Sequence, residues 1–366
     1  MKVAIVYDWI DKWGGVERVL LELHKMYPQA IFYTSYYDSK KAPWAKDLKI
    51  KTSFIQNLPK FIRESRIFSL IFYPFAFESF NFSEYDLVIS VTSSFAKAVI
   101  TSPKLKHICY LLTPTRFLWS HEKEYVSNGY WLMVIGYWLL RKGLKRWDRI
   151  VAQRPDKVIS ISQTVADRCL KYYGRKSEVI YPGMDMQYWK NVKSMLNNKT
   201  QNSSYFLVVS RLEKYKKVDL VIETFNQLQD NLIIVGEGTE EKKLKKLAGN
   251  NIQFISNISD MELAQIYSQA QALIMPQEED FGLVVLEAQF FGCPVIAYTK
   301  GGATETIIEG KTGLFFKNQT RESLRDALER FKKISYNLKS STVSYGKINA
   351  EKFSLVEFKK KFKIEF

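Results

Sequence analysis

The amino-acid sequence predicts an α/β fold made of two doubly wound, Rossmann-like domains. Short apolar runs alternate with amphipathic stretches along most of the chain, as parallel strands and crossover helices do. The alternation stops at the polar residues 191–204 and then starts again. A chain of 366 residues is long enough for two domains, each with its own hydrophobic core.

The first predicted domain covers residues 1–190 and opens with a strand at 3–7 and a helix at 16–26. Apolar runs at 87–91, 107–112, 158–162 and 179–181 predict further strands, and residues 165–173 predict a helix. The chain begins Met-Lys-Val-Ala-Ile-Val-Tyr, which reads as a strand and not as a cleavable signal. The three cysteines lack paired or metal-like spacing, so we expect buried thiols in a cytoplasmic protein.

The second predicted domain covers residues 205–346. Its expected strands are 205–210, 232–235, 252–255, 273–275 and 295–297, with a helix at 219–228. The basic, aromatic stretch at 353–366 predicts an amphipathic helix. Two doubly wound domains joined by one linker predict a central cleft that both face, at the carboxyl ends of both sheets.

The net charge of +16 predicts an anionic partner, which charge alone leaves open between phosphates, a nucleic acid and an acidic membrane surface. The basic residues are spread over the chain without a nucleic-acid-binding motif, so we expect no nucleic acid. An apolar, aromatic run at 130–140 precedes a basic run at 141–149. It is too short to span a bilayer and fits either an interfacial helix on an anionic membrane or a buried helix.

Two acids in the segment 275–294 suggest a ligand site. Glu279 precedes a glycine-marked turn, and Glu287 follows eight residues later. At about 100° per helical residue, eight steps return to within roughly 80°, so both acids can face one cleft if a helix starts near Gly282. Carboxylates accept hydrogen bonds from sugar hydroxyls, although this spacing is also common on solvated helices.

Cations and glycines at two strand ends are candidates for binding phosphates. Arg211 follows the strand 205–210, and Lys216 stands just before the helix expected near Val218, with Lys217 beside it. Gly14 and Gly15 follow the first strand and open a helix, where backbone amides can approach a phosphate. A basic loop and a glycine pair are, however, each common as solvated surface and as a tight turn.

Several sequence features together resemble the family 4 retaining glycosyltransferases. They are Glu-x7-Glu with Gly301-Gly302-Ala-Thr-Glu305 and Gly310-Lys-Thr-Gly-Leu314, Ser210-Arg-Leu-Glu-Lys-Tyr-Lys216, Val235-Gly-Glu-Gly238 and Gly14-Gly15-Val-Glu-Arg18. The likeness spans nearly the whole chain and implies the GT-B fold, with the helix at 347–366 packing back on the first domain. A Thr-Pro-x-Arg-Phe-Leu-Trp run and a Leu-Lys-Arg-Trp-Asp-Arg run make it look closest to bacterial mannosyltransferases of O-antigen and related surface polysaccharides.

The resemblance also implies roles for these residues. Glu287 accepts hydrogen bonds from the ribose, Glu279 faces the transferred sugar, and Arg211 and Lys216 hold the diphosphate, so Glu279, Arg211 and Lys216 form the expected catalytic set. Gly15 and the helix-start backbone complete the donor site, the latter at Phe281, Gly282, Leu283 and Val284. No metal is expected, because the three histidines are scattered and no Asp-x-Asp triplet is present.

One position departs from the family pattern. Many relatives carry a histidine immediately before the Thr-Pro of the first-domain motif, where this chain has Leu112. Arg116 and His121 are the candidates to compensate, His121 being also a plausible surface residue, and Gly14 is the third acceptor-side candidate.

The resemblance therefore implies a retaining hexosyltransferase that moves mannose from GDP-mannose onto a lipid-linked saccharide. We expect it to lie on the inner face of the cell membrane. Two alternatives stay open: the same fold with a UDP-sugar, since we read no short code for the base around residues 256–258, and a catalytically silent partner, because of Leu112.

Overall fold

The computed structural model describes residues 1–120, 131–196 and 205–364 and consists of two compact units, Met1–Ile180 and Tyr181–Phe366. Each unit contains one parallel sheet with helices packed against it. The predicted α/β class with two doubly wound domains is confirmed. The boundary between the units lies at residues 180 and 181, while the predicted linker begins inside α8 (Met186–Ser194) and its residues 197–204 lie outside the described part.

The first unit has a seven-stranded sheet in the order β3-β2-β1-β4-β5-β6-β7. The strands are β1 (Val3–Tyr7), β2 (Ile31–Thr34), β3 (Ile50–Thr52), β4 (Leu87–Thr92), β5 (Lys106–Leu111), β6 (Lys157–Ser160) and β7 (Glu178–Val179). The five predicted strands are present within a residue or two. The strands β2 and β3 were not predicted; both are short, and the edge strand β3 has no apolar run, whereas β2 is apolar and mostly buried.

Helices and loops cover this first sheet. The helices are α1 (Gly15–Met26), α2 (Lys60–Arg63), α3 (Tyr73–Glu78), α4 (Arg116–Trp119), α6 (Trp131–Val151) and α7 (Gln163–Tyr173), with short 3-10 turns η1 (Pro43–Ala45), η2 (Phe54–Asn57) and η3 (Ala96–Ala98). The start and end of α7 show why the sequence marks it clearly. Ser162 caps its first turn by accepting from the amide of Val165, and Gly174 ends it in the left-handed conformation.

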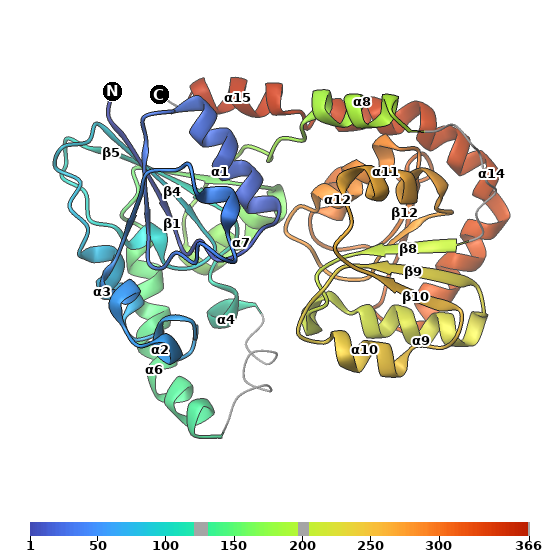
Figure 1. The fold of residues 1–366 in the computed structure, drawn as a ribbon, viewed down its shortest axis with the longest axis horizontal. Coiled ribbons are helices and arrows are strands. Elements are labelled where there is room, and N and C mark those ends of the chain that lie inside the picture. The colour runs from blue at the N-terminus through green and yellow to red at the C-terminus, as the bar shows by residue number, and fades with distance from the viewer. Residues whose placement is uncertain (121–130, 197–204, 365–366) are drawn as a thin grey trace. The chain divides into compact units, whose positions relative to one another are not determined.

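The second unit has a six-stranded sheet in the order β10-β9-β8-β11-β12-β13. The strands are β8 (Tyr205–Val209), β9 (Asn231–Val235), β10 (Ile252–Ile255), β11 (Leu273–Met275), β12 (Val295–Tyr298) and β13 (Gly313–Phe316). Figure 1 shows α9 (Val218–Leu228) and α10 (Glu241–Leu247) on one face of this sheet and α11 (Asp260–Gln269) and α12 (Leu283–Phe290) on the other. Two further short elements are η4 (Lys214–Lys216) and α13 (Ala303–Thr306).

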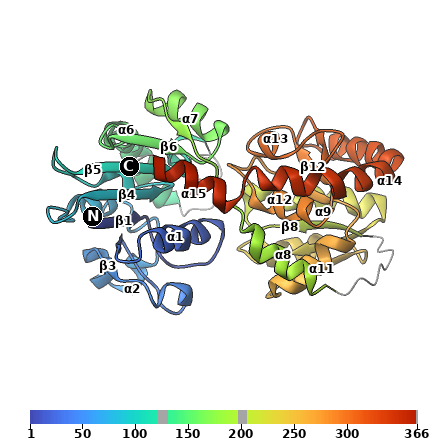
Figure 2. The same ribbon diagram turned by 90° about the horizontal axis from the view of Figure 1, so that it is seen from above.

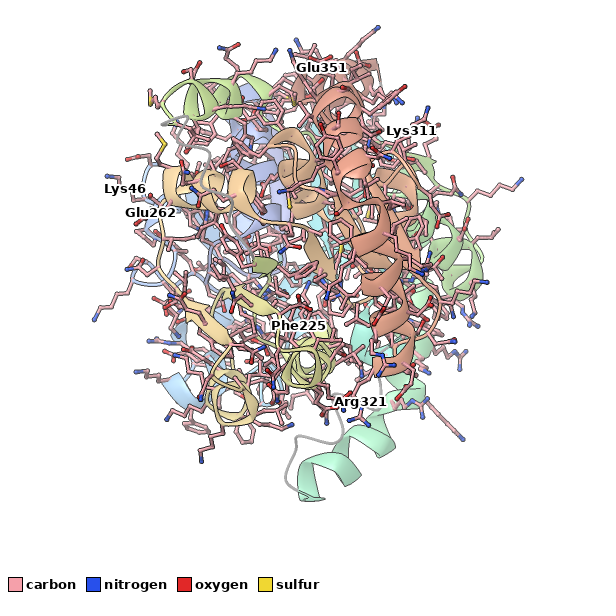
Figure 3. All side chains as sticks on the ribbon, turned by 90° about the vertical axis from the view of Figure 1, so that its right-hand side faces the viewer. Lys46, Phe225, Glu262, Lys311, Arg321 and Glu351 are labelled. Atoms are coloured by element: carbon pink, nitrogen blue, oxygen red, sulfur yellow. The ribbon has the colours of Figure 1, made fainter. Side chains whose placement is uncertain are left out.

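The longest helix of the second unit is α14 (Arg321–Glu351), which Figure 3 shows from Arg321 to Glu351, with Lys311 beside its later half. It runs next to α12 (Figure 2), and the two helices come unusually close. A Cβ atom on Gly346 would stand only 2.2 Å from the carbonyl oxygen of Gln289. The side-chain amide of Asn349 donates to the side-chain oxygen of Gln289 (2.9 Å) and to the carbonyl of Thr306 (2.8 Å). A glycine is therefore required at this crossing.

The chain ends in α15 (Leu355–Ile364), which falls inside the segment predicted to be a basic helix. The segment just before α15 is tied to the start of the second unit, since the amide of Met184 donates to the carbonyl of Phe353 (2.7 Å) and the amide of Leu355 donates to that of Met184 (3.0 Å). Within the described ranges, no helix has both the length and the apolar character needed to cross a membrane.

Candidate active site

The second sheet reverses its strand order between β8 and β11, and two predicted site residues follow these strands. From β8 the chain builds outward through β9 and β10, then returns to β11 on the other side of β8. In open parallel sheets, the loops at the carboxyl ends of the strands at such a reversal form the usual ligand site. Lys216 lies on the loop after β8 and Glu279 on the loop after β11.

Lys216 and Glu279 are in direct contact. The Nζ atom of Lys216 donates to Oε2 of Glu279, and the side-chain amide of Gln277 donates to the same oxygen at 3.2 Å. The two side chains are 10% and 17% exposed, so the pair is largely shielded from water. The neighbouring Lys217 differs, because it adopts the left-handed conformation (φ 54°) where α9 begins. The two adjacent lysines, which have the same chemistry in the sequence, therefore differ in the structure in backbone conformation and in their contact with Glu279.

A glycine pair allows the Glu279 loop to adopt its position. Gly301 has φ +82°, and a Cβ atom there would lie 2.3 Å from the carbonyl oxygen of Glu279. A Cβ on Gly302 would lie 2.4 Å from the Cα of Phe281, and its amide donates to the Glu279 carbonyl at 2.7 Å. The backbone of residues 301–302 therefore holds the backbone of Glu279 directly, which gives the glycine pair in the sequence a physical reason.

A second pair of glycines holds the loop after β8. A Cβ atom on Gly236 would stand 1.9 Å from the carbonyl oxygen of Ser210, and one on Gly238 would stand 2.3 Å from that of Leu212. These residues flank Arg211, whose exposed guanidinium donates to the hydroxyl of Tyr215 at 2.7 Å. Arg211 and Lys216 therefore share one loop, but only Lys216 is in contact with Glu279 among the contacts described here.

The helix between the two acids starts where the sequence predicted. Gly282 has φ +87° and precedes α12, which begins at Leu283 without a side-chain cap. The amides of a first helical turn have no partner within their own helix, so Gly282, Leu283 and Val284 present backbone donors beside Glu279. The side chain of Phe281 is buried and stacks on Tyr181 at 5.5 Å, so only its backbone is left for a ligand.

Glu287 lies on α12 and is only 5% exposed. Its carboxylate accepts from the hydroxyl of the buried Tyr267 on α11 at 3.3 Å. Glu279 does not lie on the helix but in an extended bridge with Gly301, so a helical-wheel angle does not relate the two acids. Their common setting comes from the loop and the helix that follow one strand, β11.

The first unit has the same reversal of strand order, between β1 and β4, and an aspartate stands there. The buried carboxylate of Asp8, just after β1, accepts from the hydroxyl of Thr92 (2.9 Å) and from the amides of Ser93 (2.8 Å), Phe95 (2.8 Å) and Ala96 (2.7 Å). The sequence analysis did not assign Asp8 a role. Its only signal was an acid immediately after a fully apolar strand.

The glycine pair after β1 begins α1 as predicted, with Gly14 at the N-cap and Gly15 as the first helical residue. The same first turn contains the buried Glu17, whose carboxylate accepts from the hydroxyl of Tyr7 at 3.0 Å. Burial and the nearby Glu17 raise the pKa of Tyr7 well above its usual value, so its hydroxyl stays a donor. A carboxylate thus stands at the helix end that the sequence analysis assigned to phosphate.

Two sequence runs that the resemblance rested on are joined by hydrogen bonds to one buried carboxylate, that of Asp148. Asp148, in the Leu-Lys-Arg-Trp-Asp-Arg run, pairs with Lys97 at 2.7 Å, and the two side chains are 0% and 2% exposed. Asp148 also accepts from Thr115 (2.9 Å) and Trp119 (2.7 Å) of the Thr-Pro-x-Arg-Phe-Leu-Trp run, and from Tyr173 (2.9 Å). This network fixes both ends of α4.

Of the three acceptor-side candidates, Arg116 lies on α4, whereas Gly14 is at the N-cap of α1. Arg116 is the first residue of α4 and is half-buried. Leu112 is buried just after β5, and its amide donates to the carbonyl of Thr92 at 2.8 Å. His121 and the residues up to 130 lie outside the described part, as do the side chains of the aromatic run through 140.

His107 and the three cysteines are core residues. Burial lowers the pKa of His107 to about 3, so this histidine is neutral, and its Nε2 shares a hydrogen bond with Ser90 at 2.8 Å. The three cysteines are buried and unpaired, as expected. Among the described residues, no three His, Cys, Asp or Glu side chains gather as a metal site would require.

Two family models match the chain, one in each half. Residues 13–188 match Glycosyltransferase Family 4, and residues 191–348 match Glycosyl transferases group 1. The uncharacterized glycosyltransferase MJ1069 of Methanocaldococcus jannaschii is 22% identical, with 93% of this chain and 95% of that protein covered. The human alpha-1,3/1,6-mannosyltransferase ALG2 is 29% identical over 181 residues, which is 42% of this chain and 43% of that protein.

Among solved structures, Anabaena Alr3699/HepE in complex with UDP is similar over 100% of this chain and 99% of its own, with a TM-score of 0.73 and 19% identity. This likeness shows the fold. The two family models together cover most of both units, and the uncharacterized glycosyltransferase MJ1069 matches over nearly the full length. The chain therefore belongs to the glycosyltransferases of the GT-B fold and is a transferase.

Proposed function

We propose that this glycosyltransferase moves mannose from GDP-mannose onto a lipid-linked saccharide with retention of configuration. The observation that carries the proposal is the shielded contact between Lys216 and Glu279 at the strand reversal of the second unit. The similarity to the human mannosyltransferase ALG2 favours mannose as the transferred sugar.

The chemistry follows from the charges at this position. As the bond from the sugar to the diphosphate breaks, negative charge grows on the diphosphate and positive charge on the sugar ring. The ammonium of Lys216 stabilises the first, with Arg211 as a second cation, and the carboxylate of Glu279 stabilises the second. Because both charges grow in the transition state, this arrangement lowers the barrier more than it strengthens binding of the intact donor. The acceptor attacks from the face that the diphosphate leaves.

The rest of the donor site is proposed from the same unit. The amides of Gly282, Leu283 and Val284 donate to sugar or phosphate oxygens at the positive end of α12. Glu287, which Tyr267 holds in place, accepts from the ribose hydroxyls. The site is proposed to neutralise the diphosphate with side chains and backbone amides, without a metal ion, and Gly15 of the first unit is the proposed additional phosphate contact.

A transfer assay with GDP-mannose and a lipid-linked saccharide tests this proposal. We expect Glu279→Gln and Lys216→Met each to lower kcat by about 10²- to 10⁴-fold, as removal of one preorganised charge does in other enzymes. Lys217→Met is the matched control, because it removes the adjacent charge and leaves the Glu279 contact intact; its kcat should change less than about threefold. Equal losses in the Lys216 and Lys217 variants would contradict the assigned roles.

The first alternative is the same reaction with a UDP-sugar. It is favoured by the similarity to HepE, whose structure was solved with UDP. The loop after β10 that contains Asn257, with φ 53°, is the expected place of base recognition. Thermal shifts with GDP-mannose and with UDP-glucose separate the two donors, since a ligand at free concentration L that binds only the folded protein stabilises it by RT ln(1 + L/Kd) and so raises the melting temperature. A shift with UDP-sugars alone removes mannose from the proposal.

The second alternative is a partner that binds nucleotide sugar without transferring it. It is motivated by Leu112, a side chain that neither donates hydrogen bonds nor carries charge. Donor binding without turnover, across mannose-accepting lipid-linked saccharides, would favour this alternative over the enzyme.

A further inference from the structure

The first unit exposes a group of apolar side chains that nothing in the described structure covers. Residues 54–75 contribute six of them, which we call the aromatic surface: Phe54 (41% exposed), Phe61 (66%), Ile67 (50%), Phe68 (46%), Ile71 (50%) and Phe75 (65%). Ring contacts join residues of different elements at two places on this surface. Phe61 of α2 lies 6.2 Å from Phe68, and Phe54 of η2 lies 6.4 Å from the half-buried Phe72.

The segment that leads into α3 is apolar on both sides. Its amides donate to carbonyls four residues back, from Ser69 to Ser65 and from Tyr73 to Ser69, so residues spaced by four lie on one side. Tyr73 and Phe77 face the core, whereas Ile67, Ile71 and Phe75 face solvent. A helical segment that is apolar all round is normally covered all round, and contiguous exposed apolar patches mark sites of interaction.

Cations adjoin the aromatic surface. A pocket of about 370 Å³ is lined by Lys40, Lys41, Lys60 and Arg63, with two carboxylates, Asp38 and Glu64, among them. We call this the basic pocket. Lys60 and Arg63 flank Phe61 on α2, so the basic pocket and the aromatic surface share that helix. The three lysines are exposed, and cations outnumber carboxylates.

This combination identifies the occupant by its chemistry. A second copy of the chain would bring the same lysines of two molecules together across a two-fold axis, and like charges oppose that pairing. An anionic bilayer offers an apolar interior for the aromatic rings and phosphate headgroups for the lysines. We propose that the aromatic surface and the basic pocket dock the first unit on an anionic lipid bilayer, the rings entering the headgroup boundary and the pocket receiving lipid phosphates.

The inference deepens the proposed function, and rests on it in one respect: docking brings the enzyme to a lipid-linked acceptor. It also assigns the membrane contact to residues 40–75, whereas the sequence left the runs at 130–149 open between an interfacial and a buried helix and offered the aromatic residues within 67–80 as a further apolar feature. Binding to vesicles requires neither donor nor turnover, so it is measured independently of transfer.

Co-sedimentation of the full chain with phosphatidylcholine vesicles, with and without phosphatidylglycerol, tests the inference. We expect binding to the anionic vesicles that weakens as salt is raised, because counterions screen the lysines. The double variant Phe61→Ser/Phe75→Ser should bind at least about tenfold more weakly, since two rings no longer enter the interface. The separate double variant Lys40→Glu/Lys60→Glu should bind more weakly than the Phe61→Ser/Phe75→Ser variant and should no longer prefer vesicles that contain phosphatidylglycerol.

A matched control removes exposed apolar side chains elsewhere. Tyr336 and Ile348 on α14 are 85% and 57% exposed, so Tyr336→Ser/Ile348→Ser should leave vesicle binding unchanged. Absence of binding by the unaltered chain, or binding that survives both double variants, overturns the inference. So does a dimer in solution that the Phe61→Ser/Phe75→Ser change dissociates. Transfer to a detergent-solubilised acceptor without vesicle binding refutes the docking surface alone, and vesicle binding without transfer refutes the proposed function alone.

Discussion

Replacing Gly301 by alanine tests whether the glycine pair positions Glu279. The substitution has two costs. An L-residue at φ +82° is strained by about 1–2 kcal/mol. The new methyl group would also stand 2.3 Å from the carbonyl oxygen of Glu279, and forcing extra volume into packed structure typically costs about 1–3 kcal/mol more. We therefore expect Gly301→Ala to destabilise the protein by about 2–5 kcal/mol.

Gly310 provides the matched control, because its φ of +73° is similar but a Cβ atom there would meet nothing within 4 Å. Gly310→Ala should therefore cost only the strain, about 1–2 kcal/mol. Urea unfolding followed by circular dichroism measures both variants, with the shift of the transition midpoint as the readout.

The two variants should also differ in activity. Because Gly301 holds the backbone of Glu279, moving this loop by about 1 Å should lower transfer by about 10²-fold under conditions where the variant is still folded. Gly310→Ala should retain nearly full activity. If Gly301→Ala were no less stable and no less active than Gly310→Ala, the close approach of residues 301 and 279 would not position the catalytic carboxylate.

Three further predictions concern the packing of each unit. Burial lowers the pKa of His107 to about 3, whereas in the unfolded chain it is about 6.5, so between pH 7 and pH 5 only the unfolded chain takes up this proton. The free energy of unfolding should therefore fall by about 2 kcal/mol over this range because of His107. Urea unfolding of His107→Gln at the two pH values should lack this contribution to the fall. Gly346→Ala should destabilise the protein by about 1–3 kcal/mol despite alanine's better helix propensity, because its methyl group meets the Gln289 carbonyl; a melting temperature equal to or above that of the unaltered chain would refute the close crossing. Asp148→Asn should cost about 3–5 kcal/mol, since it leaves Lys97 charged and buried, whereas the same change at an exposed carboxylate such as that of Asp326 should cost less than about 1 kcal/mol in the same measurement.

The sequence predicted the fold well where the physical signal is local. The fully buried strand β1 is a continuous apolar run and β4 is mostly apolar, and the spacing of such strands with amphipathic helices indicates parallel sheets. The short edge strand β3 has an exposed lysine at its centre and no apolar run, so nothing in its composition distinguishes it from a loop. β2 differs, because Ile31–Thr34 is a short, mostly buried run of β-branched and aromatic residues that carries a local signal, and the sequence analysis missed it.

The candidate site was predictable in its members but not in its contacts. Glu279 and Lys216 stand in recognisable runs, yet they are 63 positions apart and nothing in the sequence indicates the contact that the sheet creates. Lys216 and Lys217 have the same chemistry, and only the left-handed turn at Lys217 separates a shielded ammonium from its neighbour.

The buried pair of Lys97 and Asp148 shows what sequence alone misses. Its members are 51 residues apart, and each looks ordinary in isolation. The available signal was their context: a single lysine inside the apolar run at 95–100, and a single acid inside the basic run at 141–149. A charge isolated among unlike neighbours is a candidate for burial with a distant partner.

The carboxylate of Asp8 has a consequence for the division of labour between the halves of the chain. At the strand reversal of the first unit, it takes up donors of the kind that a phosphate would otherwise attract: two hydroxyls and three backbone amides. The chain thus supplies its own permanent anion there. A free phosphate would have to displace a covalently tethered competitor whose effective concentration far exceeds that of any metabolite. The two units share one architecture, but the carboxylate of Asp8 makes the strand reversal of the first unit unfavourable for binding a phosphate.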